Sequence, residues 1–544
     1  MKKIFIITFL SVLLAFPLTI HAELLQFSDV TTEHWSYEYI EKLKNLGIMK
    51  GMGNGTFGIG RTMTRAEFVT ALGNLMKWEN HNPASMSFSD VPDNEWYFGA
   101  VETALFNGAI PKGETFRPTE PITREEIAII SVCALGYNNL AANAKVSSSF
   151  SDVSNNAQYI EIAKNFGIVS GMGGDIFAPN DTAKREQAAT IFVRMNDLLN
   201  NKINFTNGFY AISSYSQINM INNFDAVGFG WSRLEFEGDS LKLNFTASNA
   251  NEYSVPDGFE QPFETANGKS RLLMVAVKDE DSARIINNSE LRAQTVNLIF
   301  SAVKNGINKD DKNLMFDGVV IDFESLQADS KLNFNTFLSD LRAQIPNKLI
   351  YVAVQPTIHF GGYDYKTIGE VADKVILMAH DFNAKTLTDE EMAQGIVMTP
   401  PASIGDVYKS LAAITDENTG VRDKNKIVLQ INFASVQWKM QNGAVLNKTP
   451  YTPDYKAIYD RIKSGNVEMK YNKDYETPYL TYKNIEDNTD NVIFYEDARS
   501  VNAKINLAQM FGISGVSVWR LGNVPNYESD IWLNVEERLA EIKN

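Results

Sequence analysis

From about Asn204 onward, the chain contains eight short apolar runs, rich in β-forming residues, that alternate with longer helical or polar segments. Most are flanked by plausible helices, such as those from Glu290 and Asn335, whose apolar residues recur at helical spacing. Eight strands alternating with helices over about 340 residues predict an α/β fold, the (β/α)8 TIM barrel, in which both faces of every strand are covered. A doubly wound open sheet is the alternative. The runs begin at Gly208, Ala226, Arg271, Phe316, Leu349, Lys374, Lys426 and Gly515.

The region before this barrel repeats one unit three times. The stretches FSDVTTEHW, FSDVPDNEW and FSDVSNNAQ begin at Phe27, Phe88 and Phe150, a period of about sixty residues. Each is followed by an amphipathic helical run, a glycine-containing turn and a second helix, for which Thr64 and Thr123 are suitable N-caps. The repeats predict a small all-α domain and hence a multidomain chain.

One of the turns, GMGNGTFGIG from Gly51, has the glycine content of a dinucleotide-binding loop. No buried strand precedes it, the motif is incomplete, and it recurs in degraded form in the other repeats. These features favour a turn between two helices.

The first residues, MKKIFIITFLSVLLAFPLTIHA, place two lysines before an apolar run that ends in a small residue, which predicts a signal peptide cleaved near Ala22. A membrane anchor is the alternative, because the run is intermediate between signal lengths and the ~20 residues that span a bilayer. No second long apolar run follows, so we expect no transmembrane segment in the mature protein. The expected units are residues 1–22 (signal peptide), 24–84, 85–147 and 148–203 (repeats) and 204–544 (barrel).

Cysteine, histidine and charge content narrow the classes of function. Cys133 is the single cysteine, which excludes a disulfide or a cysteine zinc site within one chain. The histidines beyond the leader show no metal-ligand spacing, so we expect no metal site. The formal charge of −16 becomes two units more negative when Lys2 and Lys3 are lost, which disfavours nucleic acid and anionic membranes as partners.

The stretch FDGVVIDFESL, from Phe316, brings carboxylates into an apolar run. Side chains alternate along a strand, so Val320, Asp322 and Glu324 share one face, with both acids at the end of the strand where barrel active sites form. Two acids beside apolar walls do not both ionise easily, which predicts a general acid with an ionised neighbour. The alternative is that they cap the next helix or form buried ion pairs.

This stretch resembles the Asp-x-x-Asp-x-Asp-x-Glu signature of glycoside hydrolase family 18. Asp317, Asp322 and Glu324 stand on its first, third and fourth acidic positions, and Val320 replaces the second. The run LMAHDF resembles the family's Met-x-Tyr-Asp, with His380 in place of tyrosine. The last part of the chain is most similar to spore-cortex and peptidoglycan-lytic glucosaminidases.

The resemblance implies a retaining, substrate-assisted mechanism without a metal or organic cofactor. Glu324 would protonate the glycosidic oxygen while the substrate's 2-acetamido carbonyl attacks the anomeric carbon. Asp322 would orient the acetamido N–H, and His380 with Asp381 would bond the acetamido oxygen. Val320 removes an acid that normally shares a proton with Asp322, and His380 makes one contact pH-dependent.

Aromatic residues near the strand ends are candidates for a sugar-binding cleft, because pyranose faces stack on rings. The resemblance assigns Trp519, in VSVWRLG, to the floor of the site, and Tyr215, Trp231 and Trp438 are further candidates, with rim packing as the alternative role. The long connection from Trp438 to Asn491, between strands seven and eight, predicts an α+β insertion that forms one wall of the cleft.

The three repeats resemble surface-layer homology domains, through Phe-Ser-Asp-Val, the tryptophans Trp35 and Trp96, and Thr-Arg-Ala-Glu. The resemblance implies a threefold helical assembly that binds a pyruvylated secondary wall polymer at the surface of a Gram-positive bacterium, through those tryptophans and three arginines, Arg65, Arg124 and Arg185. A solvated helix face is the alternative position for each arginine. The third repeat has Gln158 instead of tryptophan and Ala183 where the others have threonine, which predicts a weak or silent groove.

Together the two resemblances imply a wall-anchored glycosidase that cleaves bonds at N-acetylglucosamine in peptidoglycan or a chitin-like polymer. A catalytically silent glycan-binding barrel and a structural surface-layer protein are the alternatives.

Overall fold

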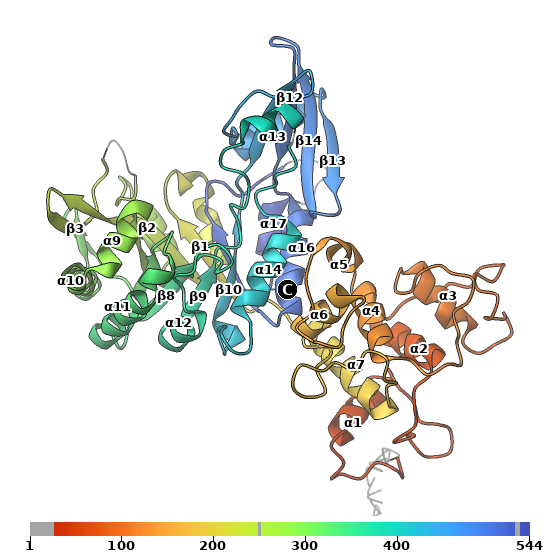
Figure 1. Cartoon of the computed structure of the whole chain (residues 1–544). Coiled ribbons are helices and arrows are strands. Elements are labelled where there is room, and N and C mark those ends of the chain that lie inside the picture. The colour runs from red at the N-terminus through yellow and green to blue at the C-terminus, as the bar shows by residue number, and fades with distance from the viewer. Residues whose placement is uncertain (1–26, 249–251, 396, 528–533, 544) are drawn as a thin grey trace, which may run out of the picture.

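The computed structural model describes residues 27–248, 252–395, 397–527 and 534–543. It shows a helical unit formed by the repeats, a larger α/β unit, and a small sheet that projects from the α/β unit (Figure 1). The predicted signal peptide, residues 1–22, lies outside the described residues. Within the described part of the chain, no helix is both long and apolar enough to cross a bilayer.

Each repeat contributes a pair of helices, and the second helix of one repeat packs on the first helix of the next. α2 contacts α3, α4 contacts α6, and α7 returns to α1, so the three repeats close into a ring. The expected three-repeat helical assembly is therefore confirmed. Its helices are α1 (Tyr37–Asn45), α2 (Arg65–Met76), α3 (Phe98–Phe106), α4 (Arg124–Ala134), α5 (Asn138–Asn143), α6 (Ala157–Asn165) and α7 (Arg185–Leu199).

A ring of three backbone hydrogen bonds lies at the centre of this unit. Met63 donates to the carbonyl of Ala183 at 3.0 Å, Ile122 to that of Met63 at 2.9 Å, and Ala183 to that of Ile122 at 3.1 Å. Each residue immediately precedes the N-cap of the second helix in its repeat. These main-chain contacts hold the three helix starts next to one another.

The predicted N-caps are present in the first two repeats. Thr64 accepts from the amide of Glu67 at 3.3 Å, and Thr123 accepts from the amide three residues further on at 3.2 Å. Both belong to capping boxes, which satisfy amide groups that the helix itself leaves unpaired. The ring of bonds corrects the alignment of the third repeat: Lys184 is the counterpart of the threonines, and Ala183 is not.

Eight parallel strands close into a barrel, in the order β1-β2-β4-β7-β8-β9-β10-β16, with β16 paired to β1. The barrel prediction is confirmed, and the open-sheet alternative is wrong. All eight predicted runs form these strands, whose residues are mostly apolar: β1 (Phe205–Tyr210), β2 (Ala226–Glu237), β4 (Ser270–Val277), β7 (Gly318–Asp322), β8 (Leu349–Val354), β9 (Lys374–Leu377), β10 (Ile427–Asn432) and β16 (Gly515–Trp519).

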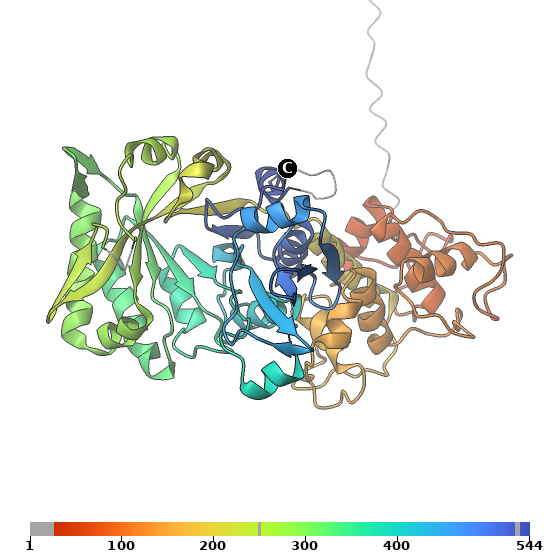
Figure 2. The ribbon, with the colours of Figure 1, turned by 90° about the horizontal axis from the view of Figure 1, so that it is seen from above.

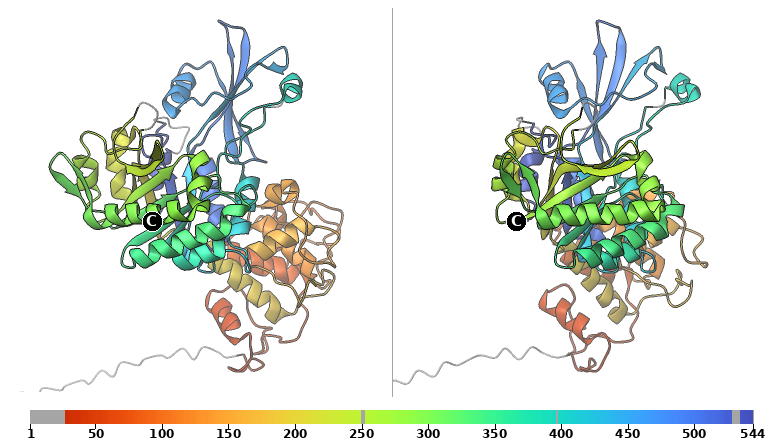
Figure 3. Two further views of the ribbon diagram at one scale, coloured as in Figure 1. Left: turned by 60° about the vertical axis from the view of Figure 1, so that its left-hand side comes forward. Right: turned by 90° about the vertical axis from the view of Figure 1, so that its left-hand side faces the viewer.

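Helices cover the outside of the barrel, and α10 and α11 lie side by side on it (Figure 3). A second apolar cluster fills the interior and includes Met274, Val320 and Ile376, all fully buried. β3 (Ser240–Asn244) extends β2 antiparallel. The outer elements are η1 (Ser214–Asn223), α8 (Glu260–Thr265), α9 (Asp279–Asn287), α10 (Ser289–Asn305), β5 (Ile307–Lys309), β6 (Lys312–Leu314), η2 (Ala328–Ser330), α11 (Lys331–Gln344), α12 (Tyr365–Val371), α14 (Ile404–Ile414), η3 (Lys424–Lys426), α16 (Ala498–Met510) and α17 (Val535–Ala540).

The connection between strands seven and eight of the barrel forms an antiparallel sheet in the order β12-β11-β15-β14-β13. This confirms the predicted α+β insertion. The helix α13 (Asp389–Gln394), from the connection after β9, packs against β12, so two connections build the projecting sheet. The insertion contains β11 (Val436–Gln441), β12 (Ala444–Val445), α15 (Tyr455–Lys463), β13 (Glu468–Asn472), β14 (Thr477–Asn484) and β15 (Thr489–Phe494).

The helical unit lies against one side of the barrel (Figure 2). Phe166, at the end of α6, meets the ring of Phe511 edge-on at a centroid distance of 5.4 Å, and both rings are buried. The side chain of Asn165 donates to the hydroxyl of Tyr408 on α14 at 2.8 Å. An apolar contact and a polar contact therefore join the third repeat to the barrel.

Candidate active site

The carboxylates predicted to work together lie at the carboxyl end of the barrel. Asp322 is the last residue of β7, and Glu324 follows two residues later. Glu324 lines a cavity of about 450 Å³, together with Asp279 from the connection after β4 and His380 and Asp381 from the connection after β9. The cavity is thus lined by acidic groups at the end of the barrel where active sites form.

Burial dominates the electrostatics of this pair. It raises the pKa of Glu324 to about 8, and the negative charges of Asp322 and Asp279 add to the effect. Burial also raises the pKa of Asp322 above its usual range, with Asp279 as the second cause. Near neutral pH, Glu324 therefore retains its proton and has the state required of a general acid.

Asp322 has an unusual shortage of partners. Its Oδ1 atom is buried and accepts no hydrogen bond from any described residue. Val320, two residues earlier on the same face, is fully buried in the apolar interior and offers no polar group. A buried acceptor without a donor is costly, so this oxygen is available for a donor on a ligand.

Gln355, the residue directly after β8, connects three groups at the pocket. Its Nε2 donates to Oε2 of Glu324 at 2.9 Å, and its Oε1 accepts from the backbone N–H of Ser325 at 2.6 Å. The hydroxyl of Tyr363 lies 3.3 Å from the same Oε1 and donates to the carbonyl of Phe323 at 2.8 Å. The amide of Gln355 thus contacts both the side chain and the following backbone of the carboxylate pair.

His380 bonds at both ring nitrogens. Its Nδ1 lies 2.8 Å from Oδ2 of Asp381, and its Nε2 lies 2.7 Å from Oε1 of Gln430. Burial alone would lower the pKa of His380, but the hydrogen bond and charge of Asp381 raise it. Burial would raise the pKa of Asp381, but His380 and a bond from Asn432 lower it. Both nitrogens are occupied, so a bond from His380 to an acetamido oxygen requires one of these contacts to break.

Asp317 lies away from this site. It precedes β7, whereas Asp322 ends that strand, which separates the two by about 16 Å at ~3.3 Å per residue. Its carboxylate accepts from the backbone N–H of Arg271 at 2.8 Å, beside the start of β4. A catalytic role for Asp317 is therefore wrong for this structure: it joins two strands at the opposite end of the barrel.

The aromatic candidates divide into two groups. Trp519 ends β16 and stacks edge-on against Phe209, with its ring partly accessible at the barrel interior. Trp231 and Trp438 are 1% and 0% exposed, so neither offers a ring face to a sugar, and the expectation that they bind substrate is wrong. Tyr215, on η1, is 60% exposed, and its hydroxyl donates to the side chain of Gln261 on α8.

Several pocket residues were not predicted. Asp279, two residues after β4, and Gln355, directly after β8, line the cavity. Asn432, which ends β10, contacts the site through Asp381, to which its side chain donates. Lys385 also lines the cavity, from the connection after β9. The first three carry a recognisable signal, since a polar residue at the carboxyl end of a barrel strand faces the site.

In the helical unit, the three predicted arginines join neighbouring repeats. Arg65, Arg124 and Arg185 each donate their Nε to the carbonyl of a phenylalanine in another repeat, at 2.7, 2.8 and 3.0 Å, and each guanidinium lies over the ring of that phenylalanine. Trp35 and Trp96 are exposed. Trp96 and Arg185 line a cavity of about 590 Å³.

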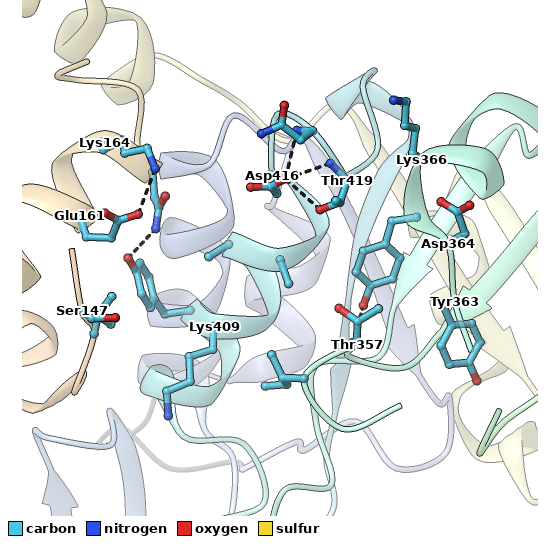
Figure 4. A pocket seen from close by; sticks show the side chains of 18 of the residues that line it. Ser147, Glu161, Lys164, Thr357, Tyr363, Asp364, Lys366, Lys409, Asp416 and Thr419 are labelled. Carbon is cyan, nitrogen blue, oxygen red and sulfur yellow. Dashed lines mark hydrogen bonds and ion pairs between the residues drawn. The ribbon is translucent and has the colours of Figure 1, made fainter. Parts of the chain in front are cut away.

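A larger cavity, of about 730 Å³, lies where the third repeat meets the barrel (Figure 4). Figure 4 shows Glu161 and Lys164 on the repeat, with Lys409 and Asp416 on the barrel side. Lys164 pairs with Glu161 at 3.2 Å, and Asp416 accepts from the backbone and hydroxyl of Thr419. These acidic groups satisfy local structure, so the smaller cavity at Glu324 is the better candidate for chemistry. Among the described residues, no cluster of three or more histidine, cysteine or acidic side chains is arranged to hold a metal ion.

Comparison with known protein families identifies the family of the barrel and that of the repeats. The glycosyl hydrolases family 18 profile matches residues 236–523, more than half of the chain, and the S-layer homology domain profile matches residues 26–69, 87–128 and 149–189. The chain belongs to glycosyl hydrolase family 18 and carries three S-layer homology domains. These domains locate it at the cell surface of a Gram-positive bacterium.

Relatives are similar to separate parts of the chain. The cortical fragment-lytic enzyme of Bacillus subtilis is 24% identical over 256 residues, which cover 45% of this chain and 54% of that protein. The surface-layer 125 kDa protein of Lysinibacillus sphaericus is 28% identical over 190 residues, or 33% of this chain and 15% of that protein. The spore cortex-lytic enzyme SleL of Bacillus megaterium has 18% identity and a TM-score of 0.47, covering 71% of this chain and 81% of SleL. The chain spans about half or less of the first curated relatives.

Proposed function

We propose that the barrel is a retaining, substrate-assisted glycosidase that cleaves β-1,4 bonds at N-acetylglucosamine in peptidoglycan or a chitin-like polymer. The observation that carries this proposal is the partly buried pair of Asp322 and Glu324, both with raised pKa values, at the carboxyl end of β7. The relationship to cortical fragment-lytic enzymes supports a wall glycan as substrate.

In this mechanism, Glu324 transfers its proton to the glycosidic oxygen as the bond to the anomeric carbon breaks. The carbonyl oxygen of the substrate's own acetamido group forms the new bond to that carbon. The unpartnered Oδ1 of Asp322 accepts the acetamido N–H, which satisfies a buried acceptor and offsets the positive charge of the oxazolinium ion. Water then attacks the anomeric carbon, which opens the oxazolinium ring, and gives a proton to Glu324. The anomeric carbon is thus attacked twice, and its configuration is retained.

Two features favour a second candidate, a catalytically silent glycan-binding barrel. Val320 stands where the family has an acid, and both nitrogens of His380 are already bonded. Such a barrel would bind oligosaccharides saturably and cleave none of them at any pH. A structural surface-layer protein would instead assemble into regular sheets after purification.

Product analysis by mass spectrometry separates these functions. The mature protein and Glu324→Gln are incubated with purified peptidoglycan and with chitin oligosaccharides. The amide retains the shape of Glu324 but has no transferable proton, so fragments ending in reducing N-acetylglucosamine are expected from the parent alone. Equal cleavage by both proteins would refute the role of Glu324, and binding without cleavage by either would favour the silent barrel.

We also propose that the S-layer homology domains bind a pyruvylated secondary wall polymer through Arg65, Arg124 and Arg185, with Trp35 and Trp96 in the same surface. Each guanidinium has the charge and planar shape that carboxylate recognition requires. The full chain should sediment with Gram-positive walls and remain in solution when the secondary polymer has been stripped. Equal sedimentation with both preparations would contradict the proposal.

A further inference from the structure

The side chain of Gln355 has only one orientation compatible with its surroundings. Its Oε1 lies 2.6 Å from the backbone nitrogen of Ser325, which carries a hydrogen and can only donate. The opposite end of the amide is then Nε2, a donor, and it faces Oε2 of Glu324 at 2.9 Å. The backbone N–H of Ser325 thus determines the orientation of the Gln355 side-chain amide.

The contact with Ser325 also restrains the backbone next to Glu324. Ser325 has a φ of +62°, a conformation that non-glycine residues rarely adopt. Two bonds hold it there: its N–H donates to Gln355, and its Oγ donates to Oδ2 of Asp279 at 2.9 Å. The backbone of Gln355 is itself fixed, because the hydroxyl of Tyr365 donates to its backbone carbonyl at 2.9 Å.

The bond from Gln355 distinguishes the two oxygens of Glu324. In a neutral carboxylic acid the carbonyl oxygen is a better hydrogen-bond acceptor than the hydroxyl oxygen, so the N–H bond to Oε2 favours Oε2 as the carbonyl oxygen. The proton is therefore carried on Oε1. After transfer, the carboxylate is ionised, and the bond from Nε2 becomes a charge-assisted one, which is stronger than a bond to the neutral acid.

We propose that Gln355 is a positioning residue for the catalytic acid: its Nε2–H occupies Oε2 of Glu324, directs the transferable proton to Oε1, and stabilises the carboxylate left by proton transfer. The inference deepens the proposed glycosidase function and rests on it. In the reaction, the Oε1–H bond breaks as the leaving oxygen gains the proton. The electron pair of the broken glycosidic bond remains on that oxygen.

A contact raises the reaction rate only if it stabilises the transition state more than the bound substrate, and the contact of Gln355 with Glu324 meets this requirement. The contact strengthens as charge develops on Glu324, so it favours the transition state over the bound substrate. Loss of the contact should lower kcat about tenfold to a hundredfold, the range expected for a hydrogen bond to a charged group, with a much smaller change in KM. It should also raise the pKa of Glu324 and move the alkaline limb of the pH profile upward.

Other charged groups face Glu324 and remain unchanged in the test. Asp322 lies on β7, Asp279 begins α9, and His380 and Asp381 follow β9. The negative groups raise the pKa of Glu324, and His380 lowers it. A shift that appears when only residue 355 is changed is therefore due to the amide contact.

Two variants and a matched control test the proposal. Gln355→Leu removes the donor and the acceptor. Gln355→Glu retains an acceptor for the Ser325 N–H, and when protonated it donates O–H to Glu324, so its activity should recover toward the parent at acidic pH and fall at neutral pH. Gln294→Leu removes another partly buried glutamine, on α10, that bonds the carbonyl of Leu241 outside the site.

The readouts are the pH profile of kcat and a ¹³C titration of the glutamate side-chain carboxyls in the full chain, in which Glu324→Gln identifies the resonance. We expect the Glu324 pKa to rise by about one unit in Gln355→Leu and to be unchanged in Gln294→Leu. An unchanged titration in Gln355→Leu, or a Gln355→Glu profile parallel to that of the parent, would overturn the proposal. If the parent cleaves no glycan, the glycosidase function fails, and the titration still decides the contact of Gln355 with Glu324.

Discussion

The Nδ1 atom of His380 lies 2.8 Å from Oδ2 of Asp381, and Gln430 holds the other ring nitrogen at 2.7 Å. With both nitrogens facing oxygen atoms, the doubly protonated ring satisfies both contacts. His380 therefore adds a positive charge beside the acidic groups Asp322, Asp279 and Asp381, and this charge lowers the pKa of Glu324.

We predict that His380→Gln raises the pKa of Glu324 and lowers activity. Glu324 must be protonated to act, so a higher pKa moves the alkaline limb of the pH profile to higher pH. Loss of the contact that fixes Asp381 should reduce kcat about tenfold to a hundredfold. His81→Gln, in the helical unit, is the control and should retain the parent profile. A profile of His380→Gln that differs only in height would refute the electrostatic role.

The raised pKa of Glu324 also predicts how stability changes with pH. Its pKa is about 8 in the folded chain and near 4.5 when unfolded, so the folded state binds more protons between these values. The contribution of this residue therefore becomes less favourable as pH rises from about 4.5 to about 8, and it is constant above that.

Glu324→Gln removes this titration. We expect the variant to melt about 2–6 °C above the parent at pH 8.5 and at the same temperature at pH 4, measured by scanning calorimetry. Glu264→Gln, at an exposed position on α8, should follow the parent at both values. A constant difference across the pH range would mean that packing, and not titration, separates the two proteins.

The sequence patterns that were informative are local. All eight strands were predictable because each is a short, mostly apolar run between helical or polar segments. The caps Thr64 and Thr123 were predictable because a capping box lies within four residues. The positions of Asp322 and Glu324 followed from strand alternation. These features need no knowledge of what lies opposite them in space.

The failures share a tertiary cause. Trp231 lies in the middle of β2 and Trp438 lies in β11, shortly after β10 ends. Trp231 is buried in the main apolar core and Trp438 in the core of the insertion. Asp317 matches a motif position but stands at the opposite end of its strand from the pocket. The contact between Gln355 and Glu324 links residues 31 positions apart, which no local pattern indicates.

The contact between the third repeat and the barrel predicts that the two units unfold together. Phe166 is 3% exposed and packs against Phe511, so Phe166→Ala leaves a cavity in the interface. We expect two separated unfolding transitions in place of a shared one, and faster proteolysis between α7 and β1. Phe106→Ala changes a ring that is 69% exposed and should leave both measurements as in the parent. A single transition in Phe166→Ala would indicate that other contacts suffice to couple the units.

The three repeats differ in the charge beside each arginine. Arg65 forms an ion pair with Glu126, and Arg185 lies 3.6 Å from Glu67. Arg124 has no carboxylate within 4 Å among the described residues, because Gln187 stands in the third repeat where the other two have glutamate. The substitution in the third repeat therefore leaves one guanidinium without an acidic partner.

We predict that Arg124 contributes more to wall binding than Arg65. A ligand carboxylate at Arg124 displaces no protein carboxylate, whereas one at Arg65 competes with Glu126. Arg124→Gln should weaken binding to purified walls about tenfold or more, and Gln187→Glu should weaken it similarly by supplying the missing acid. Arg65→Gln is the matched control and should cost less. Equal losses in Arg65→Gln and Arg124→Gln would show that the acidic partner does not decide which groove is used, and tighter binding by Gln187→Glu would reverse the argument.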